Sequence, residues 1–227
     1  MENITSLIDF LQTPRNIVIT THQKPDGDAM GSSLALYNFL QPLGHNVRVI
    51  SPTEYPSYFS YLPNYEDVYN YLENPSLSQI AIEAAELIFC LDFNDLSRIE
   101  PLNEYILKNN TTKLALIDHH LHPKINAEWV LHNTKACSTC ELVYQLFLLL
   151  NNNYIPTKEV AECIYTGILT DTGSFSNGAT NKNALLITAH LLDCGLDIIY
   201  VQEQLNQNGR EEKLRFLGNS LYRNMII

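Results

Sequence analysis

Carboxylate and imidazole side chains gather in four short segments of this 227-residue sequence. The first segment runs from His22 to Asp28 and holds one imidazole and two carboxylates within seven residues. Pro25 and Gly27 supply the sharp backbone turn that would let these three side chains converge on a metal ion. A plainer interpretation is a polar loop between a strand and a helix, with Asp28 capping the helix.

Two further segments each place one aspartate at the end of an apolar run. Asp92 follows residues 87–91, with Arg98 nearby, and Asp171 follows a helix-like stretch at 157–170. Either aspartate alone could be no more than a helix cap or a helix-terminal residue.

The fourth segment is Asp118-His119-His120, which follows an apolar run at residues 114–117. Side chains of adjacent residues point in different directions, so one histidine can bind a metal while the other addresses a substrate. Asp118 can orient an imidazole through a hydrogen bond. Four such segments at successive element ends are hard to explain as four independent caps.

The elements that must position these segments follow from the apolar pattern. Near-continuous apolar runs are typical of strands buried on both faces of a parallel sheet, and they occur at residues 17–20, 47–50, 87–91 and 114–117. Helical spacing that ends at Gly44 makes the first two runs a βαβ unit. Successive helices are predicted at 138–151, 157–170, 181–194 and 197–206, and residues 52–74 are predicted to be a connection with short helical turns. We therefore predict an α/β fold with a mainly parallel sheet flanked by helices and a helical C-terminal layer, its ligand site at the carboxyl edge of the sheet.

Composition and net charge limit the classes of protein to which this chain could belong. Hydrophobic residues make up 45% of the chain, enough for a sizeable core, and the formal net charge of -11 disfavours binding of nucleic acid through a broad basic face. Divalent cations could still reverse the local sign of an acidic cleft. No apolar run approaches the ~20 residues of a membrane span and no basic leader is present, so we expect a cytoplasmic protein with no membrane partner. Five cysteines fit free thiols better than a disulfide framework.

Other candidates for chemistry are weaker. Cys137 and Cys140 match Cys-x-x-Cys, but no second pair exists for zinc, and Ser138 with Thr139 resembles a helix N-cap. We therefore favour a structural role over redox or zinc chemistry. The histidines outside the four segments are interpreted as structural or loop residues: His45, His122, His132 and His190. The first strand is not followed by Gly-x-Gly-x-x-Gly, so a dinucleotide cofactor has no support.

The four segments, in this order, resemble the motifs of the DHH phosphoesterase superfamily. They contain His-x3-Asp-x-Asp, a single Asp, Asp-His-His and Gly-x3-Asp-Thr-Gly, between residues 21 and 175. The residues around these motifs are most similar to the bacterial oligoribonuclease (nanoRNase) and phosphoadenosine-phosphate phosphatase branch, which is related to the RecJ exonucleases: residues 21–32, Leu91-Asp92 with Arg98, residues 117–120 and residues 166–173.

This resemblance implies two divalent cations and a role for each motif position. Six side chains are implied as ligands: His22 and Asp26 on one ion, Asp28, His119 and Asp171 on the other, and Asp92 between both. Mixed imidazole and carboxylate ligands suit Mn²⁺ better than Mg²⁺ or an all-sulfur zinc site. His120 and Arg98 would contact the phosphate. Asp118 is the third residue expected to take part in catalysis.

The resemblance also implies the reaction. Water activated by the two cations would hydrolyse phosphodiester bonds of short oligonucleotides, and also phosphoadenosine phosphate. The alternatives are an inorganic pyrophosphatase-like enzyme and a non-catalytic metal- or nucleotide-binding module. The expected partner is a short oligonucleotide or small nucleotide phosphate, not a long duplex, and a homodimer is allowed.

The resemblance leaves one part of the family pattern unmatched. The related enzymes carry a second, smaller domain with a glycine-rich, histidine-containing motif, and this sequence has no such motif. We expect a DHH catalytic domain at residues 1–195 and a helical linker at 196–227 leading towards the absent second domain.

Overall fold

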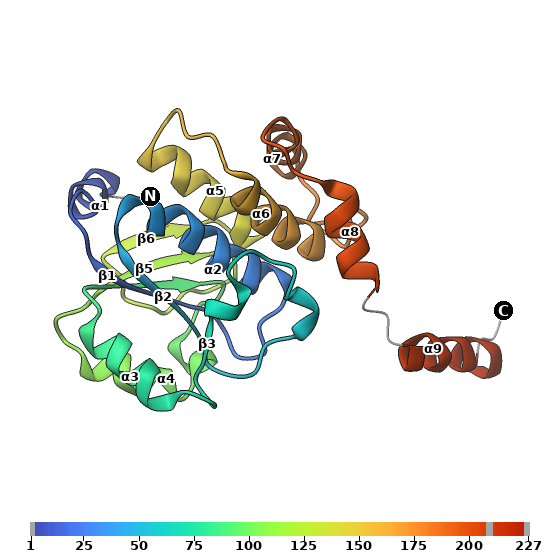
Figure 1. Cartoon of the computed structure of the whole chain (residues 1–227), viewed down its shortest axis with the longest axis horizontal. Coiled ribbons are helices and arrows are strands. Elements are labelled where there is room, and N and C mark those ends of the chain that lie inside the picture. The colour runs from blue at the N-terminus through green and yellow to red at the C-terminus, as the bar shows by residue number, and fades with distance from the viewer. Residues whose placement is uncertain (1–2, 208–210, 225–227) are drawn as a thin grey trace.

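The computed structural model describes residues 3–207 and 211–224 and shows a sheet between layers of helices (Figure 1). The strands are β1 (Asn16–Thr20), β2 (Asn46–Ser51), β3 (Tyr69–Asn70), β4 (Leu87–Leu91), β5 (Lys113–Asp118) and β6 (Trp129–His132). The α-helices are α1 (Ile4–Phe10), α2 (Gly27–Leu40), α3 (Pro75–Ala84), α4 (Leu102–Lys108), α5 (Thr139–Leu150), α6 (Lys158–Asp171), α7 (Lys182–Asp193), α8 (Ile198–Gln207) and α9 (Glu211–Asn224). Short 3-10 helices are η1 (Gln41–Leu43), η2 (Ser57–Phe59), η3 (Tyr65–Asp67) and η4 (Leu96–Ile99).

The sheet has the order β3-β2-β1-β4-β5-β6, and every neighbouring pair is parallel. This arrangement confirms the predicted α/β class and the four predicted strands. Strands β3 and β6 were not predicted. Because β1, β4 and β5 are neighbours with the same direction, the loops that follow them meet at one edge of the sheet.

The two faces of the sheet have separate cores. Alternate residues of β1 point to opposite faces: Ile17 and Ile19 pack in one apolar cluster and Val18 in the other. Helices α2 and α5 cover the first face, α6 packs on these two helices, and α3 and α4 cover the second face (Figure 1). This two-sided burial is the physical reason that the strands appear in the sequence as continuous apolar runs.

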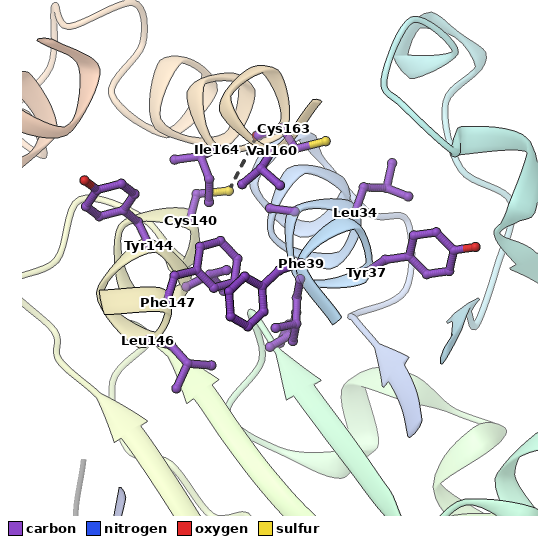
Figure 2. Close-up of a cluster of buried hydrophobic side chains, with 14 of the residues drawn as sticks. Leu34, Tyr37, Phe39, Cys140, Tyr144, Leu146, Phe147, Val160, Cys163 and Ile164 are labelled. Atoms are coloured by element: carbon purple, nitrogen blue, oxygen red, sulfur yellow. Dashed lines mark hydrogen bonds between the residues drawn. The ribbon is translucent and has the colours of Figure 1, made fainter. Parts of the chain in front are cut away.

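Helices α2, α5 and α6 pack closely above the first face. Figure 2 shows Phe39 of α2 against Phe147 of α5, with ring centroids 4.3 Å apart, and the thiol of Cys140 directed at the carbonyl of Cys163. A Cβ at Gly31 would lie 2.5 Å from that same carbonyl oxygen. Glycine at this position therefore permits the close approach of α2 to α6.

Helices α5, α6, α7 and α8 confirm the predicted helical layer, since each begins and ends within one residue of its predicted range. The region 52–74 contains η2, η3 and the two residues of β3. Gly44 ends the first crossover with φ at +90°, in the left-handed region. Of the predicted linker at 196–227, the residues 208–210 and 225–227 lie outside the described residues.

Two other expectations concern cysteines and membrane spans. All five cysteines are free, four of them are buried, and burial raises the pKa of Cys90 to about 12. Within residues 3–207 and 211–224, no single helix combines the length and apolar character that a membrane span requires. The pair α7 and α8, bent by 114°, meets that criterion by length and composition only.

Candidate metal centre

Four polypeptide segments bring acidic and histidine side chains together at the carboxyl edge of the sheet. Three of these segments follow β1, β4 and β5, and the fourth is the last turn of α6. The structure unites all six residues implied as ligands, and we call this cluster the candidate metal centre: His22, Asp26, Asp28, Asp92, His119 and Asp171.

The first segment presents one imidazole and two carboxylates in different ways. The Nδ1 atom of His22 lies 2.7 Å from the carbonyl oxygen of Gln23, so Nδ1 carries the proton and Nε2 is free to act as a ligand. The carboxylate of Asp26 accepts hydrogen bonds from the backbone N–H groups of Asp28 and Ala29 and caps α2. The interpretation of Asp28 as the cap is therefore wrong, because Asp28 already lies inside the first turn.

Asp28 faces the start of another helix. Its side chain is fully buried, with Oδ2 accepting from the N–H of Thr139 at 2.5 Å and Oδ1 accepting from the N–H of Cys140 at 2.8 Å. These N–H groups belong to the first turn of α5, where free amide donors and the helix dipole favour a negative charge. Ser138 caps α5 by accepting from the N–H of Glu141, as its sequence context predicted.

Asp92 occupies the middle of the cluster. Its Oδ2 lies 3.4 Å from Nε2 of His22, and its Oδ1 lies 3.4 Å from Nε2 of His119. The hydroxyl of Thr139 donates to Oδ1 at 2.9 Å. Asp92 is not a helix cap, because Asp95 caps η4 by accepting from the N–H of Ser97. The two carboxylate oxygens of Asp92 thus face two different groups of possible ligands.

In the Asp-His-His segment, the side chains of His119 and His120 point in different directions, as the sequence predicted. Nε2 of His119 lies 3.5 Å from Asp171 and 3.9 Å from Asp28. Nδ1 of His120 lies 2.7 Å from Oδ1 of the buried Asp118, so Asp118 orients this imidazole. The same Nδ1 is 3.7 Å from Asp92, and the two histidine rings are inclined by 71°. His120 therefore directs its Nε2 elsewhere than His119 does.

A glycine on α6 allows this helix to approach the centre. A Cβ at Gly167 would lie 2.2 Å from Sγ of Cys140 and 2.6 Å from Oδ1 of Asp28. After Asp171 the chain turns through three residues with positive φ, at Gly173, Ser174 and Phe175. The N–H of Ser174 donates to the carbonyl of Leu169 at 2.8 Å and closes the helix end.

Thr139 donates a hydrogen bond to Asp92 that the sequence did not predict, and the role of Arg98 stays a prediction. The side chain of Arg98 makes no hydrogen bond or ion pair within the part of the chain that the structure describes, although its backbone carbonyl accepts from the N–H of Gln23. Thr139 and the amide of Cys140 hold two of the candidate ligands, Asp28 and Asp92, whereas the sequence predicted only a helix start at Thr139 and a structural role for Cys140. Cys137 and Cys140 are absent from the groups of possible metal ligands among the described residues.

The histidines outside the cluster have mainly structural contacts. Nε2 of His132 lies 2.6 Å from the carbonyl oxygen of His120 and supports that turn. Nδ1 of His45 accepts from the N–H of Arg15, His190 contacts the hydroxyl of Tyr144, and His122 is exposed.

The close carboxylates of the candidate metal centre shift one another's pKa values, and a bound cation would relieve their repulsion. Burial together with the charges of Asp92 and Asp171 raises the pKa of Asp28 well above its usual range, and burial with the charges of Asp92 and Asp26 raises that of Asp171 to about 7. Burial opposes protonation of His119, but Asp92, Asp28 and Asp171 outweigh it and raise its pKa to about 9. Burial likewise works against ionisation of Asp92, yet hydrogen bonds with His119 and His22 lower its pKa.

The possible ligand atoms form three groups, and two of these groups match the implied roles. His22, Asp26 and Asp92 form one group, and Asp28, His119 and Asp171 form another, with the ligand atoms of each group within 4.8 Å of one another. A third group consists of Asp92, His119 and His120. The carboxylates of Asp28 and Asp92 are almost fully buried, so their charge needs a nearby positive partner. Closely spaced carboxylate oxygens and imidazole nitrogens are ligands that suit divalent cations.

Comparison with known proteins agrees with this geometry. The model of the DHH family, N-terminal domain, matches residues 16–168. A Thermus thermophilus protein named bifunctional oligoribonuclease and PAP phosphatase NrnA is 32% identical over 210 residues, which cover 90% of this chain and 57% of that protein. The chain thus spans little more than half the length of this curated relative.

Solved structures show the same fold. An exopolyphosphatase-related protein from Bacteroides fragilis superposes with a TM-score of 0.93 at 33% identity, over 99% of this chain and 66% of that one. Exonuclease RecJ bound to manganese superposes with a TM-score of 0.53 at 16% identity, over 85% of this chain and 48% of that one. At that identity the likeness to RecJ is one of fold alone.

Proposed function

Since this chain belongs to the DHH family, we propose that it is a manganese-dependent phosphoesterase that hydrolyses the phosphodiester bonds of short oligonucleotides and also acts on phosphoadenosine phosphate. The observation that carries the proposal is the position of Asp92, whose two carboxylate oxygens face His22 on one side and His119 on the other at 3.4 Å each. A carboxylate in this position suits a bridge between two cations.

The residues of the candidate metal centre would hold two ions. His22 and Asp26 would bind one, Asp28, His119 and Asp171 the other, and Asp92 both. Such a pair supplies Lewis acidity that lowers the pKa of water and neutralises charge on phosphoryl oxygens. The amides of α5 hold Asp28, and the Gln23 carbonyl holds His22, so that their ligand atoms stay directed at the centre.

His120 is proposed to act on the phosphate. Asp118 accepts the proton-bearing Nδ1 of the ring, which leaves Nε2 on a side chain that is 35% exposed. When the ring carries a proton on both nitrogens, Nε2–H can donate to a phosphoryl oxygen and stabilise the negative charge that develops during attack. Arg98 is proposed as a second cation for the phosphate, and its lack of an ion pair within the described residues leaves the guanidinium available.

The whole arrangement is proposed to be a catalytic domain at residues 1–195 followed by a helical linker at 196–227. The homodimer and the cytoplasmic location stay predictions.

Hydrolysis assays on matched variants test the function. The purified chain would be given Mn²⁺ and, separately, a diadenylate RNA dinucleotide, phosphoadenosine phosphate and pyrophosphate. We expect dinucleotide hydrolysis that Asp92→Asn reduces by about 10³-fold or more, since the bridging charge is lost. Asp95→Asn is the control, because Asp95 lies three residues away and its contacts, the cap of η4 and an ion pair with Lys124, involve no residue of the candidate metal centre.

Each alternative has its own result. Faster hydrolysis of pyrophosphate than of either nucleotide would favour the pyrophosphatase-like enzyme. Stoichiometric Mn²⁺ binding without hydrolysis of any substrate would favour the non-catalytic module. Equal activity of Asp92→Asn and the parent chain would refute the proposed site.

A further inference from the structure

A cavity of about 440 Å³ lies beside the candidate metal centre, between the last turn of α6 and helix α8. No step proposed above uses it. Its walls are formed by Leu169, Thr170, Gly173, Ser174, Gln202, Leu205 and Asn206. The volume lies within the range of roughly 300–1,000 Å³ that is usual for small-molecule pockets.

The cavity adjoins the more exposed side of the metal centre. Thr170 precedes Asp171 in the chain, and Gly173 and Ser174 follow it closely. Thr170 also packs on the start of α2 beside Asp26, because a Cβ at Gly27 would lie 2.5 Å from its methyl carbon. The side chain of Asp26 is 59% exposed and that of Asp171 is 22% exposed, whereas those of Asp28 and Asp92 are almost completely buried. Thr170 therefore lies between the cavity and the two exposed carboxylates of the centre.

The walls combine aliphatic surface with neutral polar groups. Leu169 and Leu205 supply the aliphatic surface, and Ser174 and Asn206 supply a hydroxyl and an amide. None of the lining residues is cationic, so the cavity does not suit a phosphate group. Flat apolar faces with polar edges are properties of a nucleobase, and the hydroxyl groups of ribose can pair with the remaining polar groups.

Gln202 has the most defined position among these polar groups. Its Nε2 donates to the hydroxyl of Tyr165 at 3.1 Å, and Tyr165 is only 1% exposed. This contact fixes the orientation of the amide. Its Oε1 accepts no hydrogen bond from any described residue, and an oriented carbonyl oxygen can accept one from a base or ribose donor.

We propose that this cavity binds a nucleoside attached to the scissile phosphate, with Gln202 as a specificity-determining residue. The proposal rests on the phosphoesterase function proposed above. In a short oligonucleotide only a few bonds separate the nucleoside from the phosphate. Occupation of a cavity flanking Asp171 would therefore position the phosphate at the metal centre.

A comparison of two substrates tests the cavity separately from the chemistry. The first is the diadenylate dinucleotide, and the second is bis-p-nitrophenyl phosphate, a diester without a nucleoside. For Gln202→Leu we expect the ratio of kcat/KM between dinucleotide and nucleoside-free diester to fall about three- to tenfold, the scale of one neutral hydrogen bond. Gln79→Leu, on α3 across the sheet, is the matched control and should keep the parent ratio. An unchanged ratio in Gln202→Leu would overturn the proposal.

A binding measurement keeps the proposal testable if the chain hydrolyses neither substrate. Adenosine, which has no phosphate and needs no metal, would be titrated into the full chain while the backbone amide resonances of Gly173, Ser174 and Leu205 are followed by NMR. Saturable shifts that Gln202→Leu weakens support the cavity as a nucleoside site, even if absent hydrolysis refutes the proposed function. No adenosine-dependent shift at these amides would refute the nucleoside site, even in an active enzyme.

Discussion

Replacing Thr139 tests how the centre is held in place. Its hydroxyl donates to Oδ1 of Asp92 at 2.9 Å, and both residues are at most 2% exposed. Thr139→Val keeps the shape of the side chain and the backbone N–H that binds Asp28, but it removes the donor. A hydrogen bond to a charged group contributes about 1.5–3 kcal/mol, so the metal-free protein should lose about that much free energy of unfolding.

The same substitution should weaken metal binding. Loss of a group that orients a ligand commonly reduces metal affinity by about 10- to 100-fold. Unfolding by urea in the presence of EDTA would measure the stability, and calorimetric titration with Mn²⁺ would measure the affinity.

Two control variants separate this effect from the general cost of changing a buried threonine. Thr139→Ser keeps the hydroxyl and should keep most of both properties. Thr188→Val removes a buried hydroxyl that donates only to the neutral carbonyl of Ala184, so it should cost less stability and leave Mn²⁺ affinity unchanged. If Thr139→Val equals the parent chain in both measurements, the hydroxyl does not support Asp92 and the reasoning is wrong.

Three further predictions concern packing, catalysis and pH. Gly167→Ala should lower the free energy of unfolding by about 1–3 kcal/mol in urea titrations, because its Cβ would overlap Cys140 and Asp28, whereas Gly178→Ala, with open space around it, should cost much less. His120→Ala should keep the parent metal content by elemental analysis but lose about 10²–10³-fold in turnover, while His119→Ala should lose metal; the reverse result would exchange the two roles. In EDTA, the stability that the raised pKa of His119 contributes is fully present below about pH 6.5 and is lost as pH rises through about 9. The raised pKa of Asp171 acts in the same direction at lower pH, and its contribution is lost as pH rises from about 4 through about 7. The melting temperature of the metal-free chain should therefore fall across that interval, less steeply in His119→Gln, and a flat profile for the parent chain would contradict the assignment.

Much of the fold could be predicted because its signals are local. Strand β4 is buried on both faces and has a five-residue apolar run with the same bounds as the strand. Strand β6 escaped prediction because its burial alternates between buried and half-buried over only four residues, and β3 has just two residues. Elements so short carry little periodicity.

For the candidate metal centre, the sequence predicts which residues take part but not the contacts that distant parts of the chain make with them. The resemblance to the DHH motifs names the six residues of the candidate metal centre. They do not show that Asp26 rather than Asp28 caps α2, because both are carboxylates two residues apart and only the backbone conformation decides. The contacts of Thr139 and Cys140 with Asp28 join residues more than 110 positions apart, and only the packing of α5 against α2 creates them.

The wide separation of the ligands along the chain has a consequence for the order of assembly. The residues of the candidate metal centre come from the segments that follow β1, β4 and β5, from the first turn of α2 and from the last turn of α6, so no single supersecondary unit contains all of them. A nascent or partly folded chain would offer only weak, incomplete coordination. Under the proposed function, cations would therefore bind only after the fold has assembled. Their binding would stabilise correctly folded molecules by mass action and reduce the fraction that is open to proteolysis.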